Sequence, residues 1–274
     1  MALQLLSYLA PSLPEELFEA LAACLRSNLN TDVELSFDPS CSGPPPGEPD
    51  PFSTGEVDLA FLCSTSYIWL TNGPQPAVEL VGAAWAPTDQ RSAGRPIYFG
   101  DVLAPRNGAR DLRALIGKRV AYNDDVSLSG YHSLRIALEA AGVADHDVRF
   151  VHSGSHLASL ELLSTGEADA ATIDSNVWRR CRRETPRLAD ELVNIAALGP
   201  HPVQPVVVRA NLPPRRREQI RAALLAARAD AVVAAAMKSA EFSHFVAISD
   251  VDFQPLRIHM ADLGLNTALA TLKP

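Results

Sequence analysis

Apolar segments with the spacing of strands alternate with segments that have the spacing of helices along most of this chain. In its first hundred residues we predict strands at 2–9, 33–37, 57–63, 78–85 and 97–103, and helices at 13–27 and 64–70. This alternation is typical of α/β layers around mainly parallel sheets. A chain of 274 residues is also long enough to form two such lobes.

Two segments interrupt the alternation. Residues 38–54 are rich in Pro, Gly and Ser, which predicts a mobile surface loop. A second break lies at 105–108, after which the pattern starts again. We predict helices at 111–116, 131–141, 156–164 and 176–182, strands at 119–122, 148–151 and 168–173, an apolar run at 206–208, and a long helix from Pro213 and Pro214 to about residue 238.

The turn before the predicted helix at 131–141 carries two hydroxyls and a glycine, in Ser127, Ser129 and Gly130. The helix begins in this turn, and Gly142 stands where its C-terminal end is expected. The first amides of a helix have no intrahelical acceptor and carry the positive end of the backbone dipole, so an oxyanion placed there gains several N–H donors. The structural alternative is that Ser129 only caps the helix.

The overall charge excludes several classes of partner. A net charge of −8 and a pI near 5.4 argue against nucleic acid or an anionic membrane as the main partner. No run of about twenty apolar residues is present, so no membrane span is expected. The first residues lack the basic segment of a signal peptide, which predicts a cytosolic protein, or a periplasmic or secreted one if a leader has been removed.

Metal, cofactor and catalytic motifs are not found in the sequence. The cysteines form no C-x-x-C pair, and His146, His152 and His156 are not expected to share a face, so we predict neither a zinc site nor another metal site. There is no phosphate-binding loop, no dinucleotide-binding turn and no nucleophile elbow. We therefore predict no cofactor and no catalytic residue.

Six segments together resemble the phosphonate-binding component of ABC transporters. The resemblance extends over nearly the whole chain, in order, and its segments are weak when taken singly. They are 58–67 (DLAFLCSTSY), 96–103 (PIYFGDVL), 116–122 (IGKRVAY), 127–131 (SLSGY), 153–156 (SGSH) and 166–175 (GEADAATIDS).

The resemblance implies a type 2 periplasmic-binding-protein fold. Such a fold has two α/β lobes, each a mixed sheet flanked by helices, with two hinge crossings and a ligand cleft between the lobes. One lobe is expected to comprise 1–104 plus 202–274, and the other 105–201. The resemblance also implies a monomer that binds a small oxyanion and works with an ABC transporter permease.

Ligand contacts follow from the resemblance only where residues match. Ser127, Ser129 and Gly130 match the Ser-Thr-Ser-Gly turn of the family, while Leu128 replaces its threonine and offers only a backbone N–H. The remaining matches lie at a second helix start, on the opposite lobe and at an acidic position that meets the cationic or protonated end of the ligand. They are Ser155 and His156, Tyr67 and Tyr98, and Asp174. A second acidic position, which binds an amine in aminophosphonate receptors, falls near Gln204.

Each of these positions also has a structural interpretation. Tyr67 and Tyr98 are also compatible with half-buried packing residues whose hydroxyls reach the surface. His156 is also compatible with a helix cap, and Asp174 with an N-cap of the next helix, a role that does not exclude ligand contact. The sequence alone leaves both interpretations open.

The function that follows is a non-catalytic solute-binding protein for a small tetrahedral oxyanion, namely phosphate, phosphite or a simple phosphonate. Two alternatives stay open at this point. One is a cytosolic enzyme on the same fold that resembles the pyrimidine synthases of thiamine biosynthesis. The other is an intracellular sensor.

Overall fold

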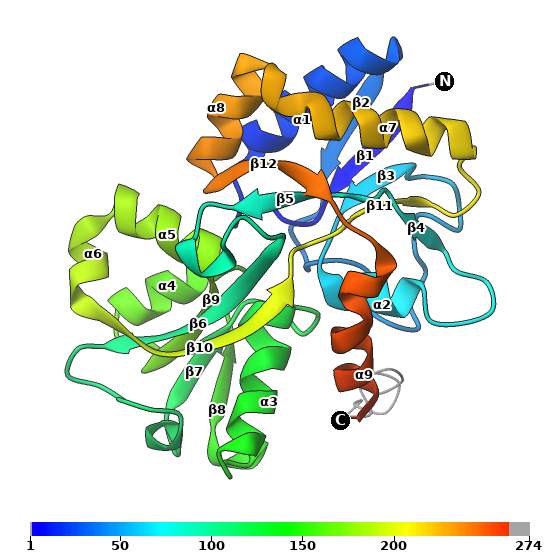
Figure 1. Ribbon diagram of the computed structural model, residues 1–274. Coiled ribbons are helices and arrows are strands. Elements are labelled where there is room, and N and C mark those ends of the chain that lie inside the picture. Colours follow the sequence, from blue (N-terminus) through cyan, green and yellow to red (C-terminus); the bar gives the residue numbers. More distant parts are fainter. Residues whose placement is uncertain (1, 263–274) are drawn as a thin grey trace.

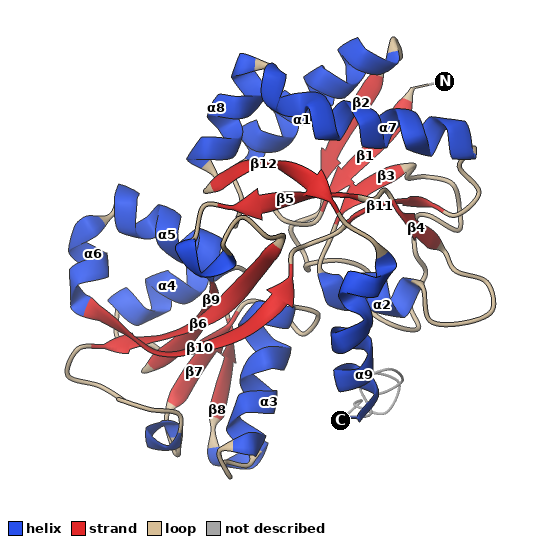
Figure 2. Ribbon diagram, viewed as in Figure 1, coloured by secondary structure: helices blue, strands red, loops and turns tan. Residues whose placement is uncertain are grey.

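The computed structural model describes residues 2–262, which form two α/β bodies joined by two chain crossings (Figure 1). We call them lobe 1, residues 2–87 and 206–262, and lobe 2, residues 97–202. The crossings are 88–96, which leads from lobe 1 into lobe 2, and 203–205, which returns. Both lobes have a mixed sheet with helices against it, as expected (Figure 2).

The sheet of lobe 1 has five strands in the order β2-β1-β3-β11-β4. The first three are parallel, while β11 runs antiparallel to both of its neighbours. The strands are β1 (Leu3–Ser7), β2 (Val33–Phe37), β3 (Leu59–Phe61), β4 (Val78–Leu80) and β11 (Val206–Arg209). A separate antiparallel ribbon consists of β5 (Ala83–Pro87) and β12 (Phe242–Ala247).

The helices of lobe 1 lie at two places. Three of them, α1 (Glu15–Leu29), α7 (Pro214–Ala226) and α8 (Ala231–Ser239), pack together beside the sheet and the ribbon. The other two, α2 (Ser64–Leu70) and α9 (Gln254–Asp262), lie next to the gap between the lobes (Figure 1). Trp85 is fully buried among Phe18, Phe61 and Phe242, and its ring stacks on the last two with centroids 5.2 and 4.7 Å away.

The sheet of lobe 2 has the strand order β10-β6-β9-β7-β8. Its strands β7, β8 and β9 are parallel, and β6 is antiparallel to β9 and β10. The strands are β6 (Ile97–Pro105), β7 (Arg119–Tyr122), β8 (Arg149–His152), β9 (Ala170–Asp174) and β10 (Leu192–Pro202). The helices are α3 (Ser133–Ala140), α4 (His156–Ser164), α5 (Ser175–Glu184) and α6 (Pro186–Glu191).

Several elements differ from the sequence-based expectation. The division expected at residue 104 assigns β6 to the first lobe, whereas β6 pairs with β9 and β10 in the sheet of lobe 2. The strand expected at 78–85 is two strands, because Gly82 adopts a φ of 84° between them. The long helix expected up to residue 238 is interrupted, since the side chain of Asp230 caps a new helix by accepting hydrogen bonds from Val232 N and Val233 N.

The structure also contains helices and strands that we did not predict, namely α6, β10, β12 and α9. Residues 38–54 form no helix or strand, as expected. Within residues 2–262, no helix combines the length and the apolar character that crossing a membrane requires.

Candidate functional site

A cavity of about 40 Å³ lies between the two lobes, more than the roughly 10–15 Å³ that one water molecule needs. Hydroxyls, amides, one imidazole and two carboxylates line it, and none of the described residues in its wall is a lysine or an arginine. The polar lining residues are Tyr8, Ser12, Ser42, Cys41, Cys63, Tyr98, Asn123, Asp124, Ser127, Ser129, Ser155, His156, Asp174 and Gln204.

The turn at Ser127 is the first wall of this cavity. Ser127 is the residue that caps the helix, because its Oγ accepts a hydrogen bond from Gly130 N at 3.1 Å, so the alternative in which Ser129 is the cap is wrong. The next five residues, Leu128–His132, form a single π-helical turn before α3 begins. Ser129 is thereby free of the capping role, is 2 % exposed and lines the cavity.

Gly130 has no Cβ, and this allows two neighbours to approach it closely. A Cβ at this position would lie 1.8 Å from Asn123 Oδ1 and 2.9 Å from His156 Cε1. The same approach leaves Ser129 Oγ 3.4 Å from His156 Nε2. The structure therefore brings together the two helix starts that the sequence singled out.

His156 begins α4, and the N-cap of that helix is Ser155, whose Oγ accepts a hydrogen bond from Ala158 N at 3.1 Å. The backbone N–H of His156 donates across the lobes to Ser12 Oγ at 3.3 Å. The imidazole is buried, and burial lowers the pKa of His156 to about 4, so the ring is neutral at pH 7. Its Nδ1 has no hydrogen-bond partner among the described residues.

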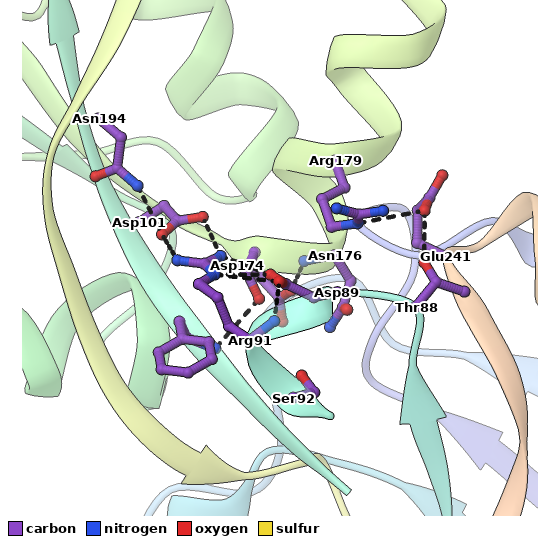
Figure 3. A network of polar contacts seen from close by, with 12 residues as sticks. Thr88, Asp89, Arg91, Ser92, Asp101, Asp174, Asn176, Arg179, Asn194 and Glu241 are labelled. Carbon is purple, nitrogen blue, oxygen red and sulfur yellow. Dashed lines mark hydrogen bonds and ion pairs between the residues drawn. The ribbon is translucent and has the colours of Figure 1, made fainter. Parts of the chain in front are cut away.

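Asp174 lies at the end of β9 and caps α5, since its Oδ1 accepts a hydrogen bond from Asn176 N at 2.7 Å (Figure 3). Its Oδ2 accepts from Gln204 Nε2 at 2.6 Å, and Gln204 Oε1 accepts from Trp85 Nε1 at 3.4 Å. Indole N–H is only a donor, which fixes the orientation of the Gln204 amide. Burial raises the pKa of Asp174 from 3.8 to about 6.

The two tyrosines that the sequence proposed differ in position. Tyr98 is fully buried and lines the cavity, and burial raises the pKa of its hydroxyl. It lies on β6 of lobe 2, the lobe that also carries Ser127, so the expectation that it comes from the opposite lobe is wrong. Tyr67 is not in the cavity wall, because its hydroxyl donates to Asp250 Oδ1 at 2.7 Å and its ring packs edge-on against Phe253. The structure thus does not bring Tyr67 to the other proposed residues.

Leu128 also turns away from the cavity. Its N–H donates to Cys63 Sγ across the lobes at 3.3 Å, and its side chain is buried in an apolar cluster with Leu256 and Met260 of α9. In this arrangement neither the backbone donor nor the side chain of Leu128 faces the cavity.

Sequence reasoning missed several residues of the wall, above all Ser12, Ser42, Asn123 and Asp124. Ser42 Oγ donates to Asp124 Oδ2 at 2.5 Å, which joins the loop at 38–54 to lobe 2. Asp124 is buried, and burial raises the pKa of its carboxyl. The polar pair Asn123 and Asp124 at the end of β7 was a usable signal, whereas nothing in the Pro-rich loop distinguished Ser42.

The arrangement differs from that of a hydrolytic triad. A nucleophilic serine needs a base that a third group orients, and the base beside Ser129 is His156, whose Nδ1 has no such partner among residues 2–262. Among residues 2–262, no group of three or more potential ligands has the geometry to hold a metal ion.

A family model and several solved structures are similar to this chain. The family model for "ABC transporter, phosphonate, periplasmic substrate-binding protein" matches residues 4–253. Among solved structures, a binding protein component of an ABC phosphonate transporter from Pseudomonas aeruginosa has 18% sequence identity and a TM-score of 0.78, with 98% of this chain and 89% of that chain covered. Comparison with curated protein sequences gives no match.

Two further structures have the same fold. PhnD1 from Prochlorococcus marinus, in complex with methylphosphonate, has 15% identity and a TM-score of 0.79, with 96% of this chain and 98% of that chain covered. The periplasmic aliphatic sulphonate binding protein SsuA from Escherichia coli has 15% identity and a TM-score of 0.63, with 99% and 94% covered.

These findings confirm the type 2 periplasmic-binding-protein fold and the family that the sequence suggested. They favour neither the pyrimidine-synthase-like enzyme nor the intracellular sensor, and they give no support to a cytosolic location, since the family is periplasmic. The chain belongs to the family of periplasmic substrate-binding proteins of phosphonate ABC transporters.

Proposed function

We propose that this protein binds a small tetrahedral oxyanion, namely phosphate, phosphite or a simple phosphonate, between its lobes. The observation that carries the proposal is the convergence of two helix starts on one cavity, with Ser129 Oγ 3.4 Å from His156 Nε2. PhnD1, which has the same fold, is described with methylphosphonate, and SsuA as an aliphatic sulphonate binding protein.

The cavity wall favours an anion of low charge. No described lining residue carries a positive side chain, and the Asp124 and Asp174 carboxyls both lie in the wall. A ligand oxygen that keeps its proton donates to Asp174, whereas a fully ionised oxygen there meets a second negative charge. The ligand that fits is therefore a monoanion.

The surroundings of Asp174 favour a ligand without an amino group. Gln204 supplies the carboxylate with a neutral donor, and Trp85 holds the amide of Gln204 in that orientation. Because Gln204 is neutral, an ammonium group at this point lacks the second carboxylate that an acidic side chain at position 204 would supply. Simple phosphonates are thus favoured over aminophosphonates.

We propose that lobe 1 completes the ligand contacts and that a transporter permease receives the closed protein. Ser12 and Ser42 take the place in lobe 1 that the sequence gave to Tyr67, because both lie in the cavity wall. Tyr98, Ser127 and Ser155, which also lie in the wall, complete the candidate contact set, whereas Gly130 lies outside the wall and its N–H donates to Ser127 Oγ. In this role the protein acts as a monomer.

Isothermal titration calorimetry with phosphate, phosphite and methylphosphonate tests the proposal. Ser129→Ala removes one donor to an anion and lowers the affinity about tenfold or more, because hydrogen bonds to charged groups contribute about 1.5–3 kcal/mol. Ser133→Ala is the matched control, since Ser133 is equally buried one turn later and lies outside the cavity wall.

A ligand at a hundredfold excess over its dissociation constant also stabilises the native protein by about 2.7 kcal/mol. No heat and no stabilisation with any of the three anions rejects the proposal. Equal affinities of the Ser129→Ala and Ser133→Ala variants reject the assignment of Ser129.

A further inference from the structure

A polar network fixes most of the first crossing to lobe 2 (Figure 3). Arg91 lies in this crossing and pairs with Asp89 Oδ2 at 2.6 Å and with Asp101 Oδ1 of β6 at 2.7 Å. Asn194 Nδ2 of β10 donates to the same Asp101 oxygen at 2.8 Å. From Asp89 onward, these contacts hold the crossing to lobe 2.

Bending of this crossing is thereby concentrated just before Asp89, at Thr88. Glu241 of lobe 1 holds this residue with two hydrogen bonds, from Thr88 N to the carbonyl oxygen at 2.9 Å and from Thr88 Oγ1 to Oε2 at 2.7 Å. Glu241 has a φ of 67°, a conformation that costs a residue with a Cβ about 1 kcal/mol or more. The hydrogen bonds to Thr88 help to hold Glu241 in this backbone conformation.

The carboxylate of Glu241 also meets α5 of lobe 2. Arg183 Nη1 pairs with Oε1, and Arg179 Nε lies 3.5 Å from Oε2 (Figure 3 shows the second contact). Arg183 Nη2 donates in addition to Ser239 O at 2.7 Å. Because Asp174 in the cavity wall is the N-cap of α5, this one helix connects the cavity to Glu241.

We propose that Glu241, with Arg179 and Arg183, is an interlobe latch that sets the proportion of closed molecules without touching the ligand. The Glu241 side chain is 10% exposed, so its charge is screened less than that of a surface carboxylate. Opening of the lobes separates this carboxylate from the two guanidinium groups while Thr88 stays attached. The latch does not depend on which ligand the cavity binds.

Hydrogen exchange of the ligand-free protein tests the latch, because two amides are bonded only across the lobes. They are Leu128 N–H, which donates to Cys63 Sγ, and His156 N–H, which donates to Ser12 Oγ. Their exchange follows the open fraction. Glu241→Gln keeps the size of the side chain and an acceptor for Thr88, and accelerates exchange of both amides about fivefold or more, a typical lower value for coupling between sites.

Asp169→Asn is the matched control, because Asp169 pairs with Arg119 within lobe 2 at 3.0 Å and leaves the interlobe contacts intact. Arg183→Gln breaks the latch from the other lobe, and also removes the bond to Ser239 O, so it accelerates exchange of the same two amides. High ionic strength accelerates the same amides in the unmodified protein less than Glu241→Gln does, because salt screens a largely buried carboxylate only weakly.

The result that overturns the latch is exchange of the Leu128 and His156 amides at the unmodified rate in Glu241→Gln. An equal acceleration of amides in the centre of the lobe 1 sheet, such as Ala60, also overturns it, since that signals general destabilisation. Equal rates in the Asp169→Asn and Glu241→Gln proteins have the same consequence. None of these outcomes decides whether the cavity binds an oxyanion, which the calorimetry tests separately.

Discussion

The carboxyl of Asp174 makes the folded state less stable at neutral pH than in mild acid, and Asp174→Asn removes this effect. Burial raises the pKa of Asp174 from 3.8 to about 6 in the folded protein. One pKa unit corresponds to 1.36 kcal/mol, so ionisation costs the folded state about 3 kcal/mol. The part of the folding stability that depends on a neutral Asp174 is therefore fully present below the unfolded-state pKa and is lost as the pH rises through the folded-state pKa.

The expected size of the effect takes account of the contacts that the substitution alters. Asparagine is a good N-cap and keeps the hydrogen bond from Asn176 N. Its NH₂ group then faces Gln204 Nε2, and the lost hydrogen bond costs about 1 kcal/mol at every pH. This cost cancels when the free energies of unfolding of the two proteins are subtracted at two pH values.

Urea unfolding of both proteins at about pH 4 and about pH 7.5 measures the difference. From the lower to the higher pH, the free energy of unfolding of Asp174→Asn rises by about 2–3 kcal/mol relative to that of the unmodified protein. The subtraction is needed because burial lowers the pKa of His132, His156 and His201 to about 4, so the unmodified protein also loses stability as the pH falls through this range.

Asp169→Asn is a control of opposite sign. The hydrogen bonds and charge of Arg119 lower the pKa of Asp169, so its stabilising contribution is present at neutral pH and lost in acid. The reasoning that burial raises the pKa of Asp174 is refuted if the difference in unfolding free energy between Asp174→Asn and the unmodified protein is the same at both pH values. It is also refuted if this difference changes with pH in the same direction as that of Asp169→Asn.

Three further outcomes are expected. Gly130→Ala forces its Cβ against Asn123 Oδ1 and destabilises the protein by about 1–3 kcal/mol in urea unfolding, with loss of oxyanion binding in calorimetry; normal binding and stability contradict the close approach. Leu128→Thr loses packing in the cluster with Met260, costs about 2 kcal/mol or more, and does not tighten methylphosphonate binding; tighter binding contradicts the position of this side chain. Gln204→Glu adds a negative charge beside Asp174 and shifts the ratio of calorimetric affinities from methylphosphonate toward 2-aminoethylphosphonate; an unchanged ratio contradicts the role of Gln204.

The elements that the sequence predicted best are those whose boundaries depend on local chemistry. Val33–Phe37, Ser64–Leu70, Arg119–Tyr122 and His156–Ser164 have the expected bounds, and the capping side chain of Ser155 marks the start of the last of them. β12 lies in an apolar segment that we left unassigned, and only its pairing with β5 makes it a strand. Lobe membership of β6 likewise depends on long-range pairing, which no local pattern encodes.

In the site as well, residues marked by local sequence could be predicted, and those whose position depends on long-range packing could not. The turn at Ser127 and the start of α4 were visible in the sequence, because the residues that cap these helices are also those that face the cavity. Tyr67 lies on α2, where position alone does not show which side of the helix another element covers. The segment at Asp250 and Phe253 covers that side, and it was not predicted.

The charge of the cavity wall means that uncharged donors, mainly hydroxyls, matter more to the proposed binding than in a site built on arginine. Two carboxyls and a neutral imidazole lie in the wall, so a bound anion gains little from ionised side chains. Its stabilisation must come from N–H and O–H groups held in fixed directions, and such groups are effective only at hydrogen-bond distance. Ser12 and Ser42 of lobe 1 lie in the wall together with polar groups of lobe 2, so the groups of both lobes surround the same volume. In the proposed mechanism binding and closure are therefore one event, and we expect substitutions far from the cavity that favour an open arrangement to weaken the affinity for the ligand.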